Sequence, residues 1–563
     1  MEQLAILVDA SIGDTQKSLQ AFMPELVICV TILGMLLVRL FRVLDVIPGF
    51  LLAGIGVAVA LFYAEPWVYL SAETLPARRE LFSGMLVLDS FTVFIRTVLL
   101  VFALLFIVFT RLSKFPESSD SVDFYTLILG STLGMCLMAS SNHLLMVFMA
   151  IEMASVPSYA LAGSLRYSRK SSEAALKYSI FGAGTAGVML YGISLIAGVT
   201  NSVHLPTIAN QLSTMELGHS ELVVLGLGGL MLMVGLAFKL SAVPFHFWCP
   251  DVFEGASAEI GAFLSVASKA AALALLVRVA LGIGAVAPDH SVAEVSQQQI
   301  SSGLFSVADT LESPSPSDHS TVSQMDQVRS FAGLLITFLA IVTCTFGNLA
   351  AYGQTNIKRL LAYSTIAHAG YMMMAVPAAL AVAGDGGNPE AGQFAIAALG
   401  LYIATYVIMN LAAFAVVAFF RNSFGSEEIS DYAGLVKRSP IVVILFSLTL
   451  FSLVGLPPLA GFLGKFAIFA SLAQSFRATG QSHLMVLLIA GGINTAISLF
   501  YYLRVVKVMT FDPEPDSSPA KPMNLVSNLG AIYLFVLAVP IVTLMVYLNP
   551  LNEWTQAAAK QLF

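Results

Sequence analysis

Three lysines and one glutamate lie inside long apolar stretches of the sequence: Glu152, Lys239, Lys269 and Lys465. With a helix rise of about 1.5 Å per residue, each lies roughly 14–18 Å from an end of the membrane span that we predict around it. The hydrocarbon core of a bilayer is about 30 Å thick, so all four charges are expected near its midplane. Charges at this depth persist where they pair, face the protein interior or contact water. We therefore predict a proton or cation relay along the membrane plane, although each lysine taken alone could be a structural ion-pair partner.

Prolines accompany two of these lysines. In "FKLSAVPFHFW", Pro244 follows Lys239 by five residues, and in "VGLPPLAGFLGKF" Pro457 and Pro458 precede Lys465. Proline interrupts a helix and frees backbone groups, which at membrane depth can bind water or ions. The interrupted spans are the seventh and the twelfth along the chain, and this odd offset gives them opposite orientations. The pattern predicts an inverted repeat in which each broken helix places polar backbone beside a switchable charge.

Further titratable residues accompany the relay. Glu152 is the carboxylate that we expect to control the charge of Lys239. His246 follows the first break and could pass protons between Lys239 and the inner side, because histidine titrates near neutral pH; a role in capping the broken helix fits equally well. His368 is a weaker candidate in the second half. Lys177 opens a span, and an anchor at the inner surface fits it better than a place in the relay.

The composition places these residues in a membrane protein. Of the 563 residues, 57% are hydrophobic and 11% are charged, whereas soluble domains are about 25% charged. We predict an all-α polytopic membrane protein with about 14 spans. The predicted spans are 21–41, 46–64, 84–110, 123–141, 143–162, 175–199, 222–247, 257–283, 330–348, 359–382, 395–420, 440–473, 483–509 and 525–548. No basic stripe points to a nucleic-acid partner.

The basic residues predict the orientation. With the N-terminus outside, most of the 27 Lys and Arg residues fall in inner loops, as the positive-inside rule requires. Both termini then lie on the periplasmic side of a bacterial inner membrane. Arg96 and Arg278 lie nearer the ends of their spans, and we expect them to snorkel to the interface. The N-terminus lacks a basic region and a clear cleavage site, so we expect no signal peptide.

The predicted spans divide the chain into five segments. Spans 4–8 and 9–13 form the two five-helix repeats, and a polar stretch rich in Ser, Gln and Asp separates them as an outer loop. The segments are 1–122 (three N-terminal helices), 123–283 (first repeat), 284–329 (polar outer loop), 330–510 (second repeat) and 511–563 (the last helix and the tail).

The sequence does not predict a metal or redox cofactor on this chain. The four cysteines, Cys29, Cys136, Cys249 and Cys344, are far apart, whereas zinc and iron–sulfur sites need clustered thiolates. The sequence contains no CxxC, no P-loop and no GxGxxG after a strand. Any redox cofactors are therefore expected on other chains.

Several of these stretches resemble subunit N of the proton-pumping NADH-quinone oxidoreductase (respiratory complex I), the NADH dehydrogenase chain 2 family. The motifs are "FKLSAVPFHFWCPDVFEGA" at 238–256, "AFLSVASKAA" at 262–271, "QTNIKRLLAYSTIAHAGYMM" at 354–373 and "GLPPLAGFLGKF" at 455–466. The resemblance implies 14 helices with two inverted, antiporter-like five-helix repeats. The 284–329 loop is longer than the family leads us to expect.

The same resemblance implies roles, partners and cofactors. Glu152 would pair with the broken-helix lysine Lys239, Lys269 would be the central lysine, and Lys465 the second broken-helix lysine. The chain would act as a subunit of an NADH:quinone oxidoreductase translocase, with the other membrane and peripheral subunits, the lipid bilayer and protons as partners. NADH, FMN, iron–sulfur clusters and quinone would be bound on or between other subunits.

Three other functions compete with this interpretation. A subunit of a multi-subunit sodium/proton antiporter would share the fold and the Glu/Lys pair, but "PFHFW" followed by "PDVFEG" argues against it. A membrane subunit of a hydrogenase-type complex is a further alternative. A purely structural scaffold is disfavoured by the layer of midplane charges.

Overall fold

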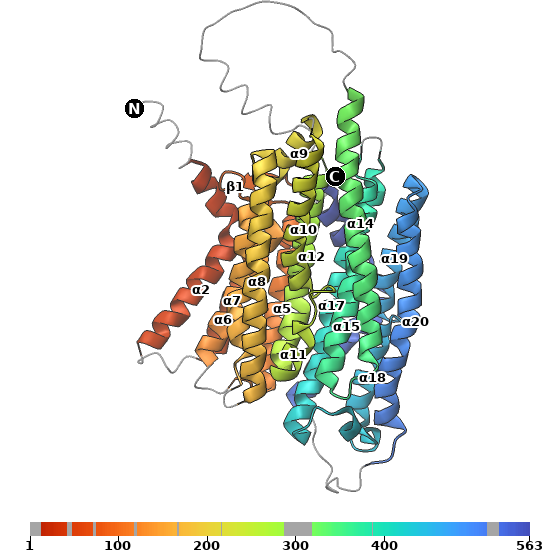
Figure 1. Cartoon of the computed structure of the whole chain (residues 1–563). Coiled ribbons are helices and arrows are strands. Elements are labelled where there is room, and N and C mark those ends of the chain that lie inside the picture. Colours follow the sequence, from red (N-terminus) through yellow and green to blue (C-terminus); the bar gives the residue numbers. More distant parts are fainter. Residues whose placement is uncertain are drawn as a thin grey trace, which may run out of the picture.

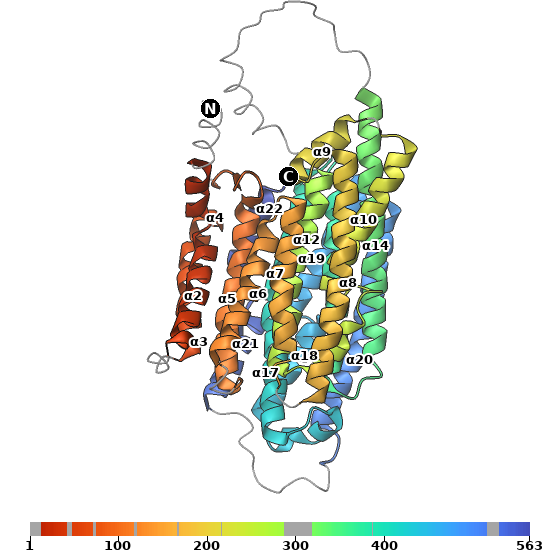
Figure 2. The same ribbon diagram turned by 60° about the vertical axis from the view of Figure 1, so that its left-hand side comes forward.

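The structure is a computed structural model of the chain and describes residues 13–41, 48–70, 75–116, 121–165, 168–215, 217–285, 318–384, 387–514 and 528–563. Long helices stand side by side in one bundle (Figure 1), with α2 and α3 at its edge (Figure 2). Within the described ranges, 11 helices are long and apolar enough to cross a membrane. The chain is a multi-pass α-helical membrane protein, as predicted.

The N-terminal segment contains a small hairpin as well as helices. Strands β1 (Arg79–Leu81) and β2 (Leu86–Leu88) pair antiparallel. The predicted span 84–110 therefore begins too early, because Asp89 caps the helix by accepting a hydrogen bond of 2.8 Å from the Thr92 amide. The helices of this segment are α2 (Met23–Leu40), α3 (Gly49–Tyr63), α4 (Pro66–Leu70) and α5 (Ser90–Leu112).

The first repeat contains five long helices and a break. The chain leaves α10 at Ser241, which adopts a left-handed conformation (φ 55°), and passes Pro244 before it enters a short helix. The long helices are α6 (Ser121–Ser140), α7 (Leu144–Ala162), α8 (Arg169–Thr200), α10 (His219–Leu240) and α12 (Ala258–Gly284), and the short helices are α9 (Leu205–Thr214) and α11 (Trp248–Gly255).

The second repeat contains the other break, at Gly455 (φ 91°), which divides the predicted span 440–473 into α18 and α19.

The prediction that 318–329 belongs to a loop is wrong, because these polar residues form the first turns of α14. The helices are α14 (Asp318–Ala351), α15 (Ile357–Met373), α16 (Ala375–Ala381), α17 (Pro389–Phe424), α18 (Pro440–Val454), α19 (Ala460–Thr479) and α20 (Ser482–Thr510), followed by α21 (Asn528–Thr543) and α22 (Asn549–Lys560).

Two helices, one from each repeat, form the centre of the bundle. α12 is buried along its whole apolar length and α17 along most of it. The two helices pack against each other, and α12 also contacts α5 and α6. Gly261 of α12 permits this close approach, because an added Cβ there would lie 2.8 Å from the Phe414 ring of α17. A polar side chain on α12 therefore lies deep inside the protein.

The expectation that Arg96 and Arg278 snorkel is wrong. Both side chains are buried and paired with carboxylates: Arg96 Nε lies 2.8 Å from a Glu25 oxygen, and Arg278 donates to Asp89 at 2.5 and 2.6 Å. A lone buried charge is costly. Each arginine avoids this cost by pairing with a buried carboxylate, and therefore does not need to reach the solvated membrane surface. These arginines therefore join helices within the core.

Candidate proton-relay site

Lys239 lies at the end of α10, directly before the first break, and is completely buried. Its Nζ donates a hydrogen bond of 3.0 Å to Ser155 Oγ on α7. The chain cannot continue α10, because Ser241 is left-handed and Pro244 has no N–H to donate. The last carbonyls of α10 are consequently open to other donors.

Glu152 lies on the same helix as Ser155, three residues earlier, and is half-buried. It is close enough to interact electrostatically with Lys239. The ion pairs among the described residues do not include Glu152 with Lys239, and Ser155 is the hydrogen-bond partner of the lysine. The structure therefore shows no direct contact between Lys239 and the carboxylate that we predicted to control its charge.

Lys269 lies midway along α12 and binds the backbone that the first break frees. Its Nζ donates to the Lys239 carbonyl at 3.2 Å and to Ser241 Oγ. The ammonium also lies 5.3 Å from the centre of the Trp248 ring, a distance at which the ring attracts a cation. The Lys269 side chain is therefore hydrogen-bonded to the main chain of Lys239, while the Lys239 ammonium contacts Ser155.

Lys465 takes the equivalent position at the second break. Its Nζ donates to the Leu453 carbonyl at 3.1 Å and to the Val454 carbonyl at 2.7 Å, the last residues of α18. The ammonium lies 4.5 Å from the centre of the Tyr371 ring. A side chain on Gly455 would meet the Lys465 stem at 3.0 Å, and its φ is 91°, so the break requires glycine there.

The two breaks share one electrostatic principle. The C-terminal end of a helix carries unpaired carbonyls and a partial negative charge. Lys269 and Lys465 place their ammonium groups on such ends. Deprotonation of either lysine would remove its positive charge and weaken its hydrogen bonds to these carbonyls. The protonation state of each lysine is therefore coupled to the geometry of the break that it contacts.

The comparisons with known proteins identify the family. A family model described as NADH:quinone oxidoreductase/Mrp antiporter, TM, matches residues 141–296 and 319–498. NADH-quinone oxidoreductase subunit N of Anaeromyxobacter sp. (strain Fw109-5) is 34% identical over 575 aligned positions that cover 100% of both chains. The chain belongs to the NADH-quinone oxidoreductase subunit N family.

Solved structures agree with this assignment. A chain of respiratory complex I from Thermus thermophilus is 28% identical, with a TM-score of 0.67 over 93% of this chain and 97% of that one. A chain of the Mrp complex from Dietzia sp. DQ12-45-1b shares the fold at 18% identity, with a TM-score of 0.73 over 97% and 98%. The residues matched by the family model include Glu152, Lys239, Lys269 and Lys465.

In this subunit N family member, most of the polar network around the second break could not be predicted from the sequence. His368 Nδ1 lies 2.8 Å from the Tyr402 hydroxyl, and its Nε2 lies 3.3 Å from that of Tyr502. Tyr502 also contacts the Ser364 hydroxyl. His368, named only as a weak candidate, is thus embedded in hydroxyl groups. Tyrosines within apolar stretches gave no signal, because their rings fit a hydrophobic core equally well.

A polar contact joins the two repeats at the centre of the subunit. Asn410 Nδ2 on α17 donates a hydrogen bond of 2.6 Å to Ser265 Oγ on α12. Ser265 lies one helical turn from Lys269. The central lysine is therefore adjacent to a polar bridge that leads into the second half.

The structure assigns different surroundings to the two lesser candidates. The His246 ring meets the Phe346 ring edge-on at 4.4 Å. Lys177 pairs with Glu173 at 2.8 Å and with Asp251 at 2.7 Å. These ion pairs favour the anchor role for Lys177, while the proton-passing role of His246 stays a prediction.

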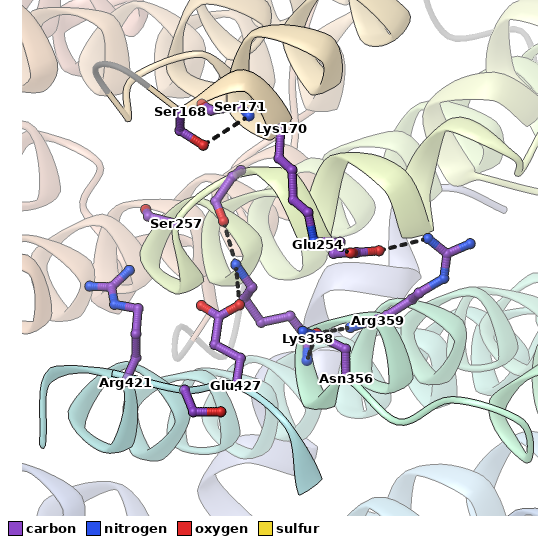
Figure 3. Close-up of polar contacts among 12 residues, drawn as sticks. Ser168, Lys170, Ser171, Glu254, Ser257, Asn356, Lys358, Arg359, Arg421 and Glu427 are labelled. Atoms are coloured by element: carbon purple, nitrogen blue, oxygen red, sulfur yellow. Dashed lines mark hydrogen bonds and ion pairs between the residues drawn. The ribbon is translucent and has the colours of Figure 1, made fainter. Parts of the chain in front are cut away.

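An ion-pair cluster holds α11 against both repeats (Figure 3). Glu254 on α11 pairs with Lys170 of α8 at 3.0 Å and with Arg359 of α15 at 2.9 Å. Burial raises the pKa of Glu254, but hydrogen bonds from Lys170 and Arg359 outweigh this effect, so its pKa lies below the ordinary value. Close by, Lys358 pairs with Glu427 at 2.8 Å. The helix that follows the first break is thus fixed to the second repeat.

The described part of the chain offers no obvious metal site. It contains no group of three or more His, Cys, Asp or Glu side chains that could hold a metal ion. The cysteines are unpaired, and Cys136, Cys249 and Cys344 are buried on separate elements.

Proposed function

We propose that this chain is a proton-translocating membrane-arm subunit of NADH-quinone oxidoreductase. Electron transfer from NADH to quinone on other subunits drives protons across the membrane through it. One observation carries the proposal: the buried ammonium groups of Lys269 and Lys465 bind the open carbonyl ends of the two broken helices. A buried cation held by a helix end has its charge set by its neighbours, which a relay requires.

The relay runs from Glu152 through Lys239 and Lys269 to Lys465. A change in charge at Glu152 acts electrostatically on Lys239, whose ammonium is held by Ser155. Lys269 donates a hydrogen bond to the backbone carbonyl of Lys239, and like charges at neighbouring lysines repel, so a proton on one disfavours a proton on the other. The polar bridge from Ser265 to Asn410 leads toward the second repeat, where Lys465 takes up or releases a proton.

The remaining expectations follow from this function. NADH, FMN, iron–sulfur clusters and quinone are bound on or between other subunits and supply the redox chemistry. The partners are the other membrane and peripheral subunits and the bilayer. The location is the bacterial inner membrane, with both termini on the periplasmic side, as the distribution of Lys and Arg supports.

A native gel tests membership of the complex. Membranes that contain the tagged chain are solubilised in mild detergent and stained in the gel for NADH dehydrogenase activity. We expect the chain to comigrate with a large flavin-containing band that stains. A small band of hydrophobic chains without that activity would contradict the proposal.

A sodium/proton antiporter subunit is the second candidate. The description of the matching family model names Mrp antiporters as well. This chain also has the same fold as the chain of the Dietzia Mrp complex. The antiporter function requires sodium-dependent proton flux without NADH. Flux measurements in vesicles with and without sodium separate the two candidates.

A further inference from the structure

An apolar groove between α10, α12 and α14 has no part in the relay. Its volume is about 410 Å³, and apart from Gln327 and Arg329 its lining residues are apolar or glycine. Along α10 the lining runs from Leu222 to Leu236, about 21 Å at the rise of a helix. One leaflet of the hydrocarbon core is about 15 Å deep. The groove therefore spans the depth of one leaflet.

Side chains of the described residues leave the groove open. Its floor is buried, with Leu236 0% and Leu276 1% exposed, whereas Val223 at its edge is 57% exposed. Gly226 of α10 lines the groove, and a Cβ added there would meet nothing within 4 Å. An apolar channel that opens sideways at membrane depth suits a hydrocarbon chain.

Arg329 makes one end of the groove polar. Its side chain is only 9% exposed, and it donates to the Gly284 carbonyl at 2.6 Å and to Asp326 at 2.9 Å. Arg329 also lines a second cavity, of about 650 Å³, together with Ser330, Asn388 and His483. Apolar and polar cavities thus meet at one guanidinium group.

We propose that the groove binds an anionic phospholipid. The acyl chain lies between α10 and α14, and the phosphate lies beside Arg329. Guanidinium groups bind phosphate through paired charge-assisted hydrogen bonds. The Asp326 side chain is 58% exposed, so it can turn into solvent when a phosphate takes its place beside the guanidinium. The lipid joins α10 and α12 of the first repeat to α14 of the second.

Photolabelling of the intact complex tests this proposal. The purified complex is placed in vesicles that contain phosphatidylglycerol with a diazirine in its acyl chain. After illumination, the labelled peptides are mapped by mass spectrometry. We expect adducts in residues 222–236 and 327–336, and several-fold fewer of them with a phosphatidylcholine probe.

Two variants with matched controls make the test specific. Gly226→Leu fills the groove and should reduce labelling several-fold. Gly184→Leu on α8, where an added Cβ also meets nothing within 4 Å, should leave it unchanged. Arg329→Gln should reduce phosphatidylglycerol labelling to the phosphatidylcholine level, and Arg329→Lys should retain part of it. A native gel checks that each variant assembles.

Two results would overturn the proposal. Equal labelling by both lipids, unchanged in Gly226→Leu and Arg329→Gln, would mean that only passing bilayer lipid enters the groove. Absence of adducts in an assembled complex would mean that another protein segment covers it. Neither result would affect the relay, because the groove shares no residue with it.

Discussion

The two broken helices carry the same chemical groups in opposite order. In the first repeat the lysine precedes the break, and in the second it follows the break. Helical side chains point toward the N-terminus of their helix. Lys239 therefore points away from the open end of α10 and meets Ser155, while Lys465 points back to the open end of α18. The order of lysine and proline decides which lysine binds the free carbonyls.

This difference explains why the first repeat needs two lysines. The Lys239 side chain points away from the C-terminal end of α10. Lys269 of α12 instead donates a hydrogen bond to the Lys239 carbonyl at that end. In the second repeat Lys465 alone binds two carbonyls. The first break is therefore contacted by Lys269 and flanked by Lys239, whereas the second is contacted by Lys465 alone, beside the Tyr371 ring.

The largest effect is expected for Lys465→Glu. A carboxylate would face the Leu453 and Val454 carbonyls, and an uncompensated buried charge costs about 3–5 kcal/mol. We expect loss of assembled complex on native gels, whereas Lys465→Ala should assemble but lose pumping. Normal amounts of complex in Lys465→Glu would show that these carbonyls do not require a cation.

Lys269→Met tests whether Lys239 needs Lys269 to pass on its charge. It leaves the Lys239 carbonyl and Ser241 without their donor, and each unsatisfied buried group costs about 1–3 kcal/mol. We expect roughly tenfold slower proton pumping at normal complex content, measured as dye quenching in vesicles. Unchanged pumping would mean that Lys239 passes charge without Lys269.

Ser155→Ala tests the hydroxyl group that accepts the hydrogen bond from Lys239. A hydrogen bond to a charged group contributes about 1.5–3 kcal/mol. We expect a several-fold loss of pumping and a shift in its pH profile, with partial recovery in Ser155→Thr, which keeps the hydroxyl. A profile identical to that of the wild type would remove Ser155 from the relay.

Glu254→Gln should have the smallest effect, at the ion pairs that join the two repeats. The pKa of Glu254 lies below its ordinary value of 4.5, so its ion pairs stabilise the fold above that pH and lose this contribution as pH falls through the folded-state pKa. We expect a slightly lower melting temperature at pH 7, and a difference that shrinks in acid. Glu390→Gln, at an exposed position of α17, is the control. A difference that grows in acid would contradict this account.

The sequence was sufficient to predict the helical class and both breaks. A charge inside an apolar stretch and a nearby proline are local signals, readable without any tertiary contact. The partners of the lysines could not be predicted, because Ser155 lies 84 positions from Lys239 and resembles any small residue of a membrane helix. The buried pairs of Arg96 and Arg278 were missed for the same reason, since Glu25 lies on α2 and Asp89 directly precedes α5, both far from their partners in the sequence.

Boundaries failed where local polarity was misleading. The first turns of α14 are polar and were assigned to a loop, although a helix can extend beyond the apolar core. The strand at residues 86–88 is apolar and was assigned to a span. In both cases hydropathy reports the surroundings of a residue and not its backbone conformation.

The central claim is that the buried lysines carry the moving charge, and Lys239→Ala tests it most directly. The measurement is the number of protons moved per NADH oxidised in vesicles that contain the assembled complex. Lys507→Ala, which removes a lysine that is 68% exposed, is the control. We expect a loss of about tenfold or more for Lys239→Ala and none for Lys507→Ala. A normal ratio in assembled Lys239→Ala complex would contradict the relay.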